Sequence, residues 1–459
     1  MTRTTNTTRR AVGAEFRAAL WAVRHPGMVL TPITAGYSAL EWGMLPTGSV
    51  LGGATLAALA WYRAHPGSFD HWAAPRVRAW RRRWLSAYTG PRWRSLMDAV
   101  DLERVHKKTG HTLYPGVVRV RAFSPNVDIV HVRMLKGQSK RTYQAKLEEL
   151  ADTLKVERVA IEATKPGHLA LIVQRREAFT TPIPAPDMPA TSAEVDPAAL
   201  VIGEDEYGGD WTESVVGPAM HRLIAGATGA GKNSVVLAML LGLAPWFRDG
   251  LAKLWIIDPK MMEFTALREV CENRYADNSA DGVDLLQRYV DNMERTQKHM
   301  QSLGVREQPI SREFPLHVLV VDELARLVAF ADDGSEARAI NNALAKITSM
   351  GRTTHHSVTA TTIDPSKDVL DIRDLFPSKI CLRVSSPTQP DMVLGAEMRE
   401  RGAIADEIPN LPETAGIGYR VGERTRYPQR VRAAYTSDAD MVEFVRFVTE
   451  GRRNLRSVA

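Results

Sequence analysis

The sequence predicts an α/β protein with a parallel sheet, preceded by a small α/β domain and an N-terminal helical hairpin. Between residues 199 and 435, five apolar runs with strand character alternate with helical patterns. Such uninterrupted apolar strands, separated by helices, are typical of a parallel sheet covered on both faces. Residues 115–178 contain shorter alternating runs around one helical segment, and residues 28–62 contain two mostly apolar stretches.

Length and composition set the limits of this organisation. At 459 residues the chain is long enough for two or three domains. The apolar content of 44% and charged content of 24% exclude a largely disordered chain. The only cysteines, Cys271 and Cys381, are far apart, which excludes a disulfide framework and a cysteine-based zinc site.

The apolar stretches at residues 28–62 predict a transmembrane hairpin after an N-terminal tail of residues 1–27. Met28–Met44 and Gly48–Tyr62 each approach the length that crosses a bilayer, and Leu45-Pro46-Thr47 is expected to separate them. Arginines flank both ends, which places the two ends in the cytoplasm. Glu41 counts against this interpretation. The alternative is a buried helical hairpin in a soluble domain.

The segment that follows, residues 63–104, is basic and aromatic. Residues 1–100 hold thirteen arginines, no lysine and four acidic residues, and also seven of the ten tryptophans. This asymmetry indicates a membrane surface or nucleic acid as a partner. The position next to the hairpin favours a juxtamembrane segment lying on anionic lipid, and a DNA-contacting arm is the alternative.

The remaining boundaries follow from composition and pattern. The small α/β domain is predicted at residues 105–180. A linker rich in Pro and Ala follows at 181–198, and the main α/β domain occupies 199–435. Residues 436–459 are expected to form a C-terminal tail with one short helix.

A phosphate-binding loop is predicted at residues 226–232, between an apolar strand and a helical run. Its glycines allow backbone N–H groups to surround phosphate oxygens, and the following helix adds the positive end of its dipole. Lys232 would reach the β- and γ-phosphates of ATP. The predicted nucleotide-binding residues of the loop are Gly226, Ala227, Thr228, Gly229, Ala230, Gly231 and Lys232.

The residue after the lysine departs from the usual pattern. A Ser or Thr hydroxyl normally binds Mg²⁺ there, and this chain has Asn233 followed by Ser234. Adjacent helical residues point about 100° apart, so Ser234 does not simply replace the hydroxyl. The Asn233 carbonyl oxygen is a weaker Mg²⁺ ligand, which makes nucleotide binding a firmer expectation than fast hydrolysis.

Two more strands deliver acidic residues to the same sheet edge. The apolar run LHVLVV ends in Asp322-Glu323, where Asp322 would hold Mg²⁺ and Glu323 would orient and deprotonate the attacking water. The run LAKLWII ends in Asp258-Pro259-Lys260. Thr361 ends a further strand and is positioned to sense the γ-phosphate. Because carboxyl ends of parallel strands form the ligand edge, Asp258 and Thr361 join the predicted nucleotide site.

In order and spacing, GATGAGK, IIDPKMMEF, VLVVDELARL and SMGRTTHHSVTATTIDPS resemble the FtsK/SpoIIIE/Tra family of double-stranded DNA translocases. The apolar N-terminus and the AGKNS variant are most similar to Tra proteins of mycelial actinobacteria, which pass plasmid DNA between cells. The resemblance implies a RecA-like ATPase that forms a hexameric ring, with duplex DNA through its centre and ATP and Mg²⁺ between subunits. Accessory transfer proteins are further expected partners.

The chain also departs from this family. Thr362-Ile363-Asp364 stands where members usually carry a Gln, and Asp391 lies near the position of a frequent arginine. An arginine that reaches into the ATP site of a neighbour would then be Arg352 or Arg383.

Two other functions remain open at this point. One is a secretion-type ATPase, which the single ATPase domain disfavours. The other is a nucleotide-binding replication or scaffold protein with weak turnover, which Asn233 and the missing Gln favour.

Overall fold

The computed structural model describes residues 37–85, 88–329, 334–366, 371–422 and 427–458. The chain divides into two compact units, residues 1–77 and 78–459. The predicted N-terminal tail, residues 1–27, and most of the first predicted membrane stretch lie outside the described residues.

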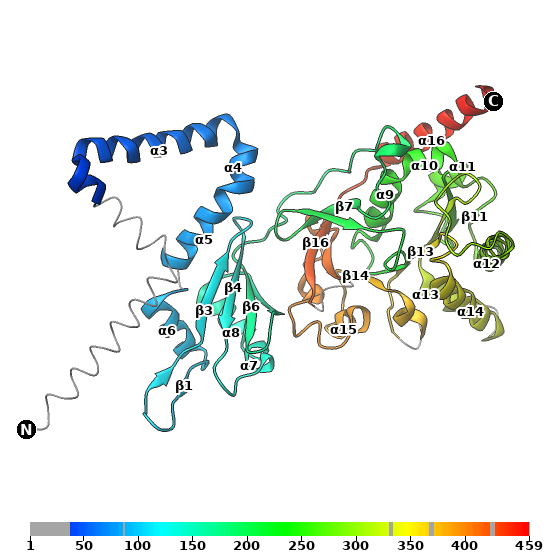
Figure 1. Ribbon diagram of the computed structural model, residues 1–459. Coiled ribbons are helices and arrows are strands. Elements are labelled where there is room, and N and C mark those ends of the chain that lie inside the picture. The colour runs from blue at the N-terminus through cyan, green and yellow to red at the C-terminus, as the bar shows by residue number, and fades with distance from the viewer. Residues whose placement is uncertain (1–36, 86–87, 330–333, 367–370, 423–426, 459) are drawn as a thin grey trace, which may run out of the picture. The chain divides into compact units, whose positions relative to one another are not determined.

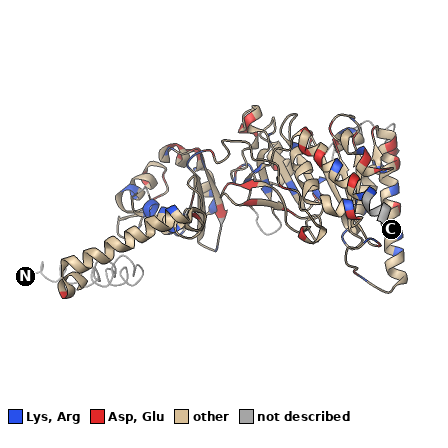
Figure 2. Ribbon diagram, turned by 90° about the horizontal axis from the view of Figure 1, so that it is seen from above, with Lys and Arg blue, Asp and Glu red and all other residues tan. Residues whose placement is uncertain are grey.

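The first unit contains one helix that is long and apolar enough to cross a membrane, within the part of the chain that the structure describes. This helix, α3 (Met44–Ala64), has 21 residues and almost no buried side chains. Figure 2 shows it as an almost entirely tan helix, because Arg63 is its only charged residue. The shorter α4 (Pro66–Trp72) follows.

Helix α3 begins earlier than the sequence pattern predicts. Pro46 lies in its first turn, where a missing N–H leaves no hydrogen bond unmade, so Leu45-Pro46-Thr47 does not interrupt the helix. The break falls instead at Gly43, which has a φ of 86° that favours glycine.

The small α/β domain has a four-stranded antiparallel sheet in the order β3-β4-β6-β5 (Figure 1). Its strands are β3 (Gly116–Arg121), β4 (Val127–Arg133), β5 (Arg158–Ala163) and β6 (His168–Gln174). The predicted helix at 140–154 is divided into α7 (Lys140–Gln144) and α8 (Leu147–Leu154). A separate two-stranded hairpin is formed by β1 (Arg104–Val105) and β2 (Thr112–Leu113).

The core of this domain extends into the segment predicted as juxtamembrane. Helix α6 (Gly90–Ala99) packs Trp93, Leu96 and Met97 into the same apolar cluster as β4 and β6. Helix α5 (Ala74–Leu85) precedes it. The structural boundary therefore lies near residue 78 and not at 105, because burial of α6 is decided by tertiary contacts and not by local charge.

The main domain is built on one ten-stranded sheet, in the order β11-β10-β12-β13-β9-β14-β15-β16-β7-β8. The first six strands in this order are parallel, which confirms the predicted α/β class. They are β9 (Arg222–Ala225), β10 (Ala252–Ile257), β11 (Tyr275–Ala276), β12 (Leu316–Val321), β13 (His356–Thr362) and β14 (Ser378–Leu382).

Helices cover both faces of the parallel strands, as continuous apolar strands require. Along β10, Leu254 and Ile256 pack on one face, whereas Trp255 and Ile257 pack on the other. The first face carries α9 (Lys232–Gly242), α10 (Ala244–Asp249), α11 (Arg268–Cys271) and α16 (Asp438–Val458). The second carries α12 (Ser279–Ser302), α13 (Leu324–Ala329) and α14 (Gly334–Met350).

Four antiparallel strands extend the sheet beyond β14 and were not predicted. They are β15 (Ile417–Val421), β16 (Gln429–Ala433), β7 (Leu200–Asp205) and β8 (Asp210–Glu213). The short helix α15 (Gln389–Leu394) connects to this part. Two ion pairs connect this extension to the small domain. Arg158 of β5 pairs with Glu206 at 2.7 Å, and Arg430 of β16 pairs with Glu177 at 2.6 Å.

The predicted C-terminal tail is part of the main domain. Residues Asp438–Val458 form the 21-residue helix α16, which packs on α10 (Figure 1). Phe444 and Val448, one helical turn apart, are buried in the main core, and the ring of Phe444 meets that of Phe247 edge to face. These two apolar positions are too few to predict a core helix from the sequence.

Replacing Phe444 with Ala should therefore destabilise the main domain. The ring is 2% exposed, and removal of such a side chain costs about 3–5 kcal/mol because a cavity remains. Denaturant-induced unfolding followed by circular dichroism measures the change. Val442→Ala on the same helix is the control, because Val442 is 65% exposed and should change stability by less than about 0.5 kcal/mol. Equal stability of the two variants would contradict a core role for α16.

Candidate nucleotide-binding and hydrolysis site

The predicted phosphate-binding loop lies between β9 and α9, at the carboxyl end of the parallel strands. Its start is held by two neighbouring strands. The Gly226 N–H donates to the Thr362 carbonyl at 3.0 Å, and the Ala227 N–H donates to the Arg383 carbonyl at 2.8 Å. The loop is thus suspended between β13 and β14, while Thr228 and Gly229 are exposed at its tip.

Glycine is required at position 231 for two reasons. Its φ of 92° is in the left-handed region, and a Cβ there would lie 2.5 Å from the Gly416 nitrogen. The Gly416 N–H also donates to the Ala230 carbonyl at 2.9 Å. The unpredicted antiparallel strands therefore support the loop from the side opposite to β13.

Lys232 begins α9 and folds back over the loop. Its ammonium donates to the Gly226 carbonyl at 2.8 Å and lies 3.4 Å from the Ala227 carbonyl. Burial lowers the pKa of Lys232, and the nearby Glu323 and Asp322 carboxylates oppose that shift. The cation is therefore held inside the loop without a direct carboxylate partner among the described residues.

Asp322 follows β12 and is 3% exposed. Its Oδ1 accepts a hydrogen bond from the Thr361 hydroxyl at 2.7 Å, whereas its buried Oδ2 has no hydrogen-bond partner among the described residues. Burial raises the pKa of Asp322, and the Thr361 hydroxyl counteracts part of this rise. A buried carboxylate oxygen without a partner is a ready ligand for a cation.

Glu323 has a φ of 50°, an uncommon conformation for a residue with a side chain, and its N–H donates to the Thr361 hydroxyl oxygen at 2.9 Å. Its carboxylate accepts from the Ile363 N–H at 2.9 Å and from the Lys260 ammonium at 3.3 Å. Thr361 thus fixes both acidic residues, and Lys260 contacts Glu323 directly.

Asp258 is brought to the same edge but is mainly engaged in holding its own loop. Its Oδ2 accepts from the Phe264 N–H and the Tyr275 hydroxyl, both at 3.1 Å. Its Oδ1 is buried without a hydrogen-bond partner in the described part of the chain. Asp258 therefore organises residues 259–264 and leaves one oxygen available.

The two residues after Lys232 face different surroundings. The Asn233 side-chain amide donates to Glu263 at 2.5 Å. Ser234 instead lines a separate cavity of about 340 Å³ with Pro412, Glu413, Arg432 and Tyr435. This arrangement agrees with the expectation that Ser234 does not replace the missing hydroxyl at position 233.

Arg383 lies against its own phosphate-binding loop. Its guanidinium donates to the Thr228 carbonyl at 2.7 Å, and the side chain is largely buried. An arginine bonded in this way is not available to a neighbouring subunit.

Arg352 is exposed after α14 and remains the candidate for contact with a neighbouring subunit. The sequence did not predict the contacts that Arg383, Glu263 and Gly416 make at this site. In each contact the two partners are distant along the chain, so no local pattern indicates it.

The residues present fit ATP with Mg²⁺. The exposed tip of the loop offers backbone N–H groups, Lys232 supplies a cation, and Asp322 Oδ2 supplies a free carboxylate oxygen. Asn233 occupies the position whose hydroxyl usually completes the Mg²⁺ site.

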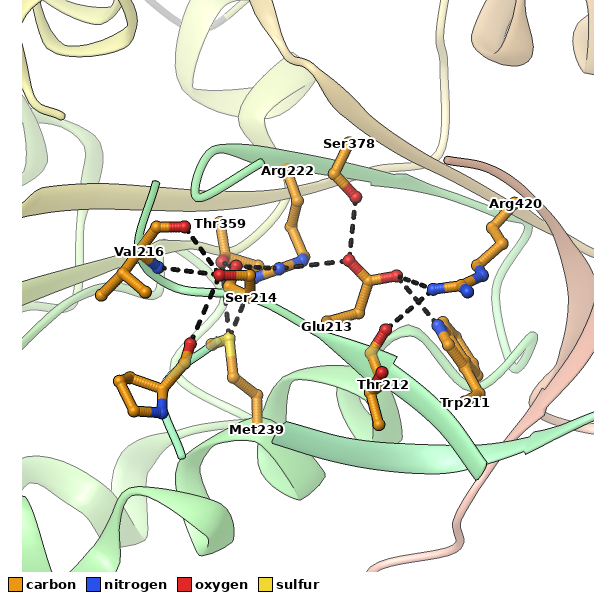
Figure 3. A network of polar contacts seen from close by, with 11 residues as sticks. Trp211, Thr212, Glu213, Ser214, Val216, Arg222, Met239, Thr359, Ser378 and Arg420 are labelled. Atoms are coloured by element: carbon orange, nitrogen blue, oxygen red, sulfur yellow. Dashed lines mark hydrogen bonds and ion pairs between the residues drawn. The ribbon is translucent and has the colours of Figure 1, made fainter. Parts of the chain in front are cut away.

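The strand that leads into the loop is anchored by a buried polar network around Glu213 (Figure 3). The Glu213 carboxylate accepts from Arg222 of β9 at 3.2 Å, from Arg420 of β15 at 3.1 Å and from the Ser378 hydroxyl at 3.0 Å. Burial by itself would raise the pKa of Glu213, but the two arginines outweigh it, so this pKa lies below its ordinary value.

Glu213→Gln should lower the free energy of unfolding by about 3–5 kcal/mol near neutral pH, because it leaves buried arginine charge without its partner. A depressed pKa stabilises the fold above the unfolded-state pKa, about 4.3, and that contribution is lost as the pH falls through the folded-state value. The difference between wild type and variant should therefore shrink in acid. Denaturant titrations at neutral and acidic pH test this, with the exposed Glu307→Gln as control. A difference independent of pH would contradict the assignment.

Comparisons with a family model and with individual proteins both find similarity to FtsK proteins. Residues 191–314 match the FtsK/SpoIIIE family model. The DNA translocase FtsK of Corynebacterium efficiens is 24% identical over 378 residues, which cover 74% of this chain and 38% of the relative. The DNA translocase FtsK of Staphylococcus epidermidis is 29% identical over 283 residues, covering 55% and 32%. The chain thus spans less than two-fifths of the length of these relatives.

Among solved structures, the pCW3 conjugation coupling protein TcpA, in its monomer form with ATPγS, aligns with 75% of this chain and 94% of that chain. The sequence identity is 18% and the TM-score is 0.49. The family match covers the phosphate-binding loop and the strand that ends in Asp258. Over residues 191–314 the chain is thus similar to the FtsK/SpoIIIE family, and its main domain has a P-loop ATPase fold.

Proposed function

We propose that this protein is a membrane-associated motor that hydrolyses ATP to move double-stranded DNA, in conjugative transfer of a plasmid or mobile element between cells. The observation that carries the proposal is the meeting of Lys232, Asp322 and Glu323 at one edge of the sheet, with Thr361 bonded to both acidic residues. Relatives that are named DNA translocases support the choice of substrate.

In this proposal the loop N–H groups and Lys232 bind the phosphates of ATP. Asp322 Oδ2 and the Asn233 side-chain oxygen would hold Mg²⁺, which would neutralise part of the phosphate charge. Glu323 orients the attacking water and takes its proton. Its contact with Lys260 fixes the direction of the carboxylate.

The proposed assembly is a homo-hexamer with ATP between subunits and duplex DNA through the centre, acting with accessory transfer proteins. Exposed Arg352 is the proposed contact to the ATP of the neighbouring subunit, because Arg383 is engaged with its own loop. Contacts to DNA would be made to phosphates. Binding should therefore weaken steeply with salt and show little sequence preference.

The proposed location is the cell membrane, with the motor in the cytoplasm. Helix α3 supports this because its 21 residues suffice to span the hydrocarbon core. The basic residues that follow it agree with a cytoplasmic location of its C-terminal end.

ATP turnover by the full chain in detergent micelles, with and without linear duplex DNA, tests the proposal. We expect turnover to rise severalfold with DNA and to depend on Mg²⁺. ATP binding without DNA stimulation would contradict a DNA motor, and it would favour the secretion-type ATPase or a scaffold instead.

The alternative of a nucleotide-binding scaffold with weak turnover is favoured by one observation, the Asn233 amide bonded to Glu263 where a hydroxyl usually binds Mg²⁺. Asn233→Ser restores that hydroxyl. If Asn233 limits the site, the variant should need about tenfold less Mg²⁺ for half-maximal turnover, the lower end of typical metal-site effects.

The matched control is Asn273→Ser, an exposed position remote in sequence from the loop. An unchanged Mg²⁺ requirement in Asn233→Ser would show that the amide oxygen suffices and would remove the support for weak turnover.

A further inference from the structure

Helix α5 has one face that is anchored to the small domain. Arg78 donates to the Phe123 carbonyl at 2.7 Å, and Arg82 donates to the Pro125 carbonyl at 3.3 Å. Arg82 also lies 3.6 Å from the buried Asp128 carboxylate. These contacts fix the rotation of the helix about its axis.

The opposite face is apolar, and two of its three side chains are exposed. At about 100° per residue, Val77, Trp80 and Trp84 share a face that points away from Arg78 and Arg82. Val77 is 58% exposed and Trp80 is 54% exposed. The Arg83 guanidinium lies over the Trp84 ring at 5.6 Å. Trp84 is half-buried, and the exposed Val77 and Trp80 on this anchored helix mark an interaction surface.

Positive charge borders this face. Arg76 and Arg81, both exposed, lie on its two sides. Residues 63–94 contain eight arginines and one acidic residue, Asp70. Tryptophan together with arginine is the combination found where a helix lies in the headgroup layer of a membrane.

We propose that the Val77–Trp80–Trp84 face of α5 lies in the headgroup layer and binds anionic phospholipid. This inference rests on the proposed membrane association and adds a second contact to it. Chain continuity supports it, since α3 ends at Ala64 and α5 begins at Ala74. Each arginine near an anionic surface is attracted to it. Lipid fits better than DNA, because a phosphate backbone would engage the arginines but leave Val77 and Trp80 exposed to water.

Spin labels on single introduced cysteines in the full chain test the inference. The native Cys271 and Cys381 are buried, so an exposed cysteine will be labelled selectively. Val77→Cys reports on α5 and keeps both tryptophans, Leu56→Cys reports on α3, and the exposed Val442→Cys on α16 is the water-facing reference. Collision rates with oxygen and with a water-soluble nickel chelate are measured in nanodiscs of phosphatidylcholine, with and without phosphatidylglycerol.

In discs containing phosphatidylglycerol we expect the label at 77 to be severalfold less accessible to nickel than the label at 442. Without the anionic lipid this protection should largely disappear. Arg81→Glu should abolish it, whereas the same charge change at the exposed Arg352 should not.

Full nickel access at 77 in anionic discs, with the label at 56 immersed, would overturn the inference and leave the membrane span intact. Equal protection with both lipids would overturn the requirement for anionic headgroups, and protection only after addition of duplex DNA would assign the face to DNA. A water-exposed label at 56 would instead refute membrane association itself.

Discussion

Glu323→Gln should reduce the turnover number for ATP by about 10²–10⁴-fold, the range expected for loss of a general base. The change keeps the size of the side chain and its acceptor oxygen for the Ile363 N–H. It removes the carboxylate that takes the proton from water and that contacts Lys260. Binding of ATP should stay within a few-fold of wild type, because Glu323 contacts neither the phosphate-binding loop nor Lys232 through a hydrogen bond among the described residues.

Single-turnover hydrolysis and fluorescent-nucleotide titration separate the two effects. Glu313→Gln is the matched control, since its side chain is 71% exposed and it should behave as wild type. Turnover in Glu323→Gln above about a tenth of wild type would be too high for loss of a general base, and the assignment would then be incorrect.

Lys232→Ala should lower kcat/KM for ATP by about 10²–10³-fold, the effect of removing one preorganised charge from a transition state. The Lys232 ammonium is held by the carbonyls of Gly226 and Ala227, which places it inside the loop before nucleotide arrives. The fold should be unaffected, because the side chain belongs to no apolar cluster among the described residues.

Steady-state kinetics and a thermal unfolding curve on the same samples test this prediction. Lys346→Ala is the control, because its ion pair with Glu294 is solvent-exposed and contributes little. A variant that unfolds at lower temperature in parallel with its loss of activity would indicate a structural role for Lys232 instead.

The sequence alone predicted the parts of the site that are contiguous in the chain. The loop at 226–232, the strand ending in Asp322-Glu323 and the strand ending in Asp258 each combine an apolar strand with a polar end. The parallel arrangement then places these ends at one edge, because all strands in such a sheet point the same way. The α/β class and the small α/β domain followed from the same patterns.

Only the tertiary structure decided which groups touch. The pairing of β12 with β13 sets Thr361 beside Asp322 and Glu323, and the position of β15 places Gly416 against Gly231. Tertiary packing likewise buries α6 in the core of the small domain and α16 in the core of the main domain, whereas the sequence predicted a juxtamembrane segment and a tail. These features depend on strand register and on packing between distant segments, whereas local periodicity specifies only the elements and the residues at their ends.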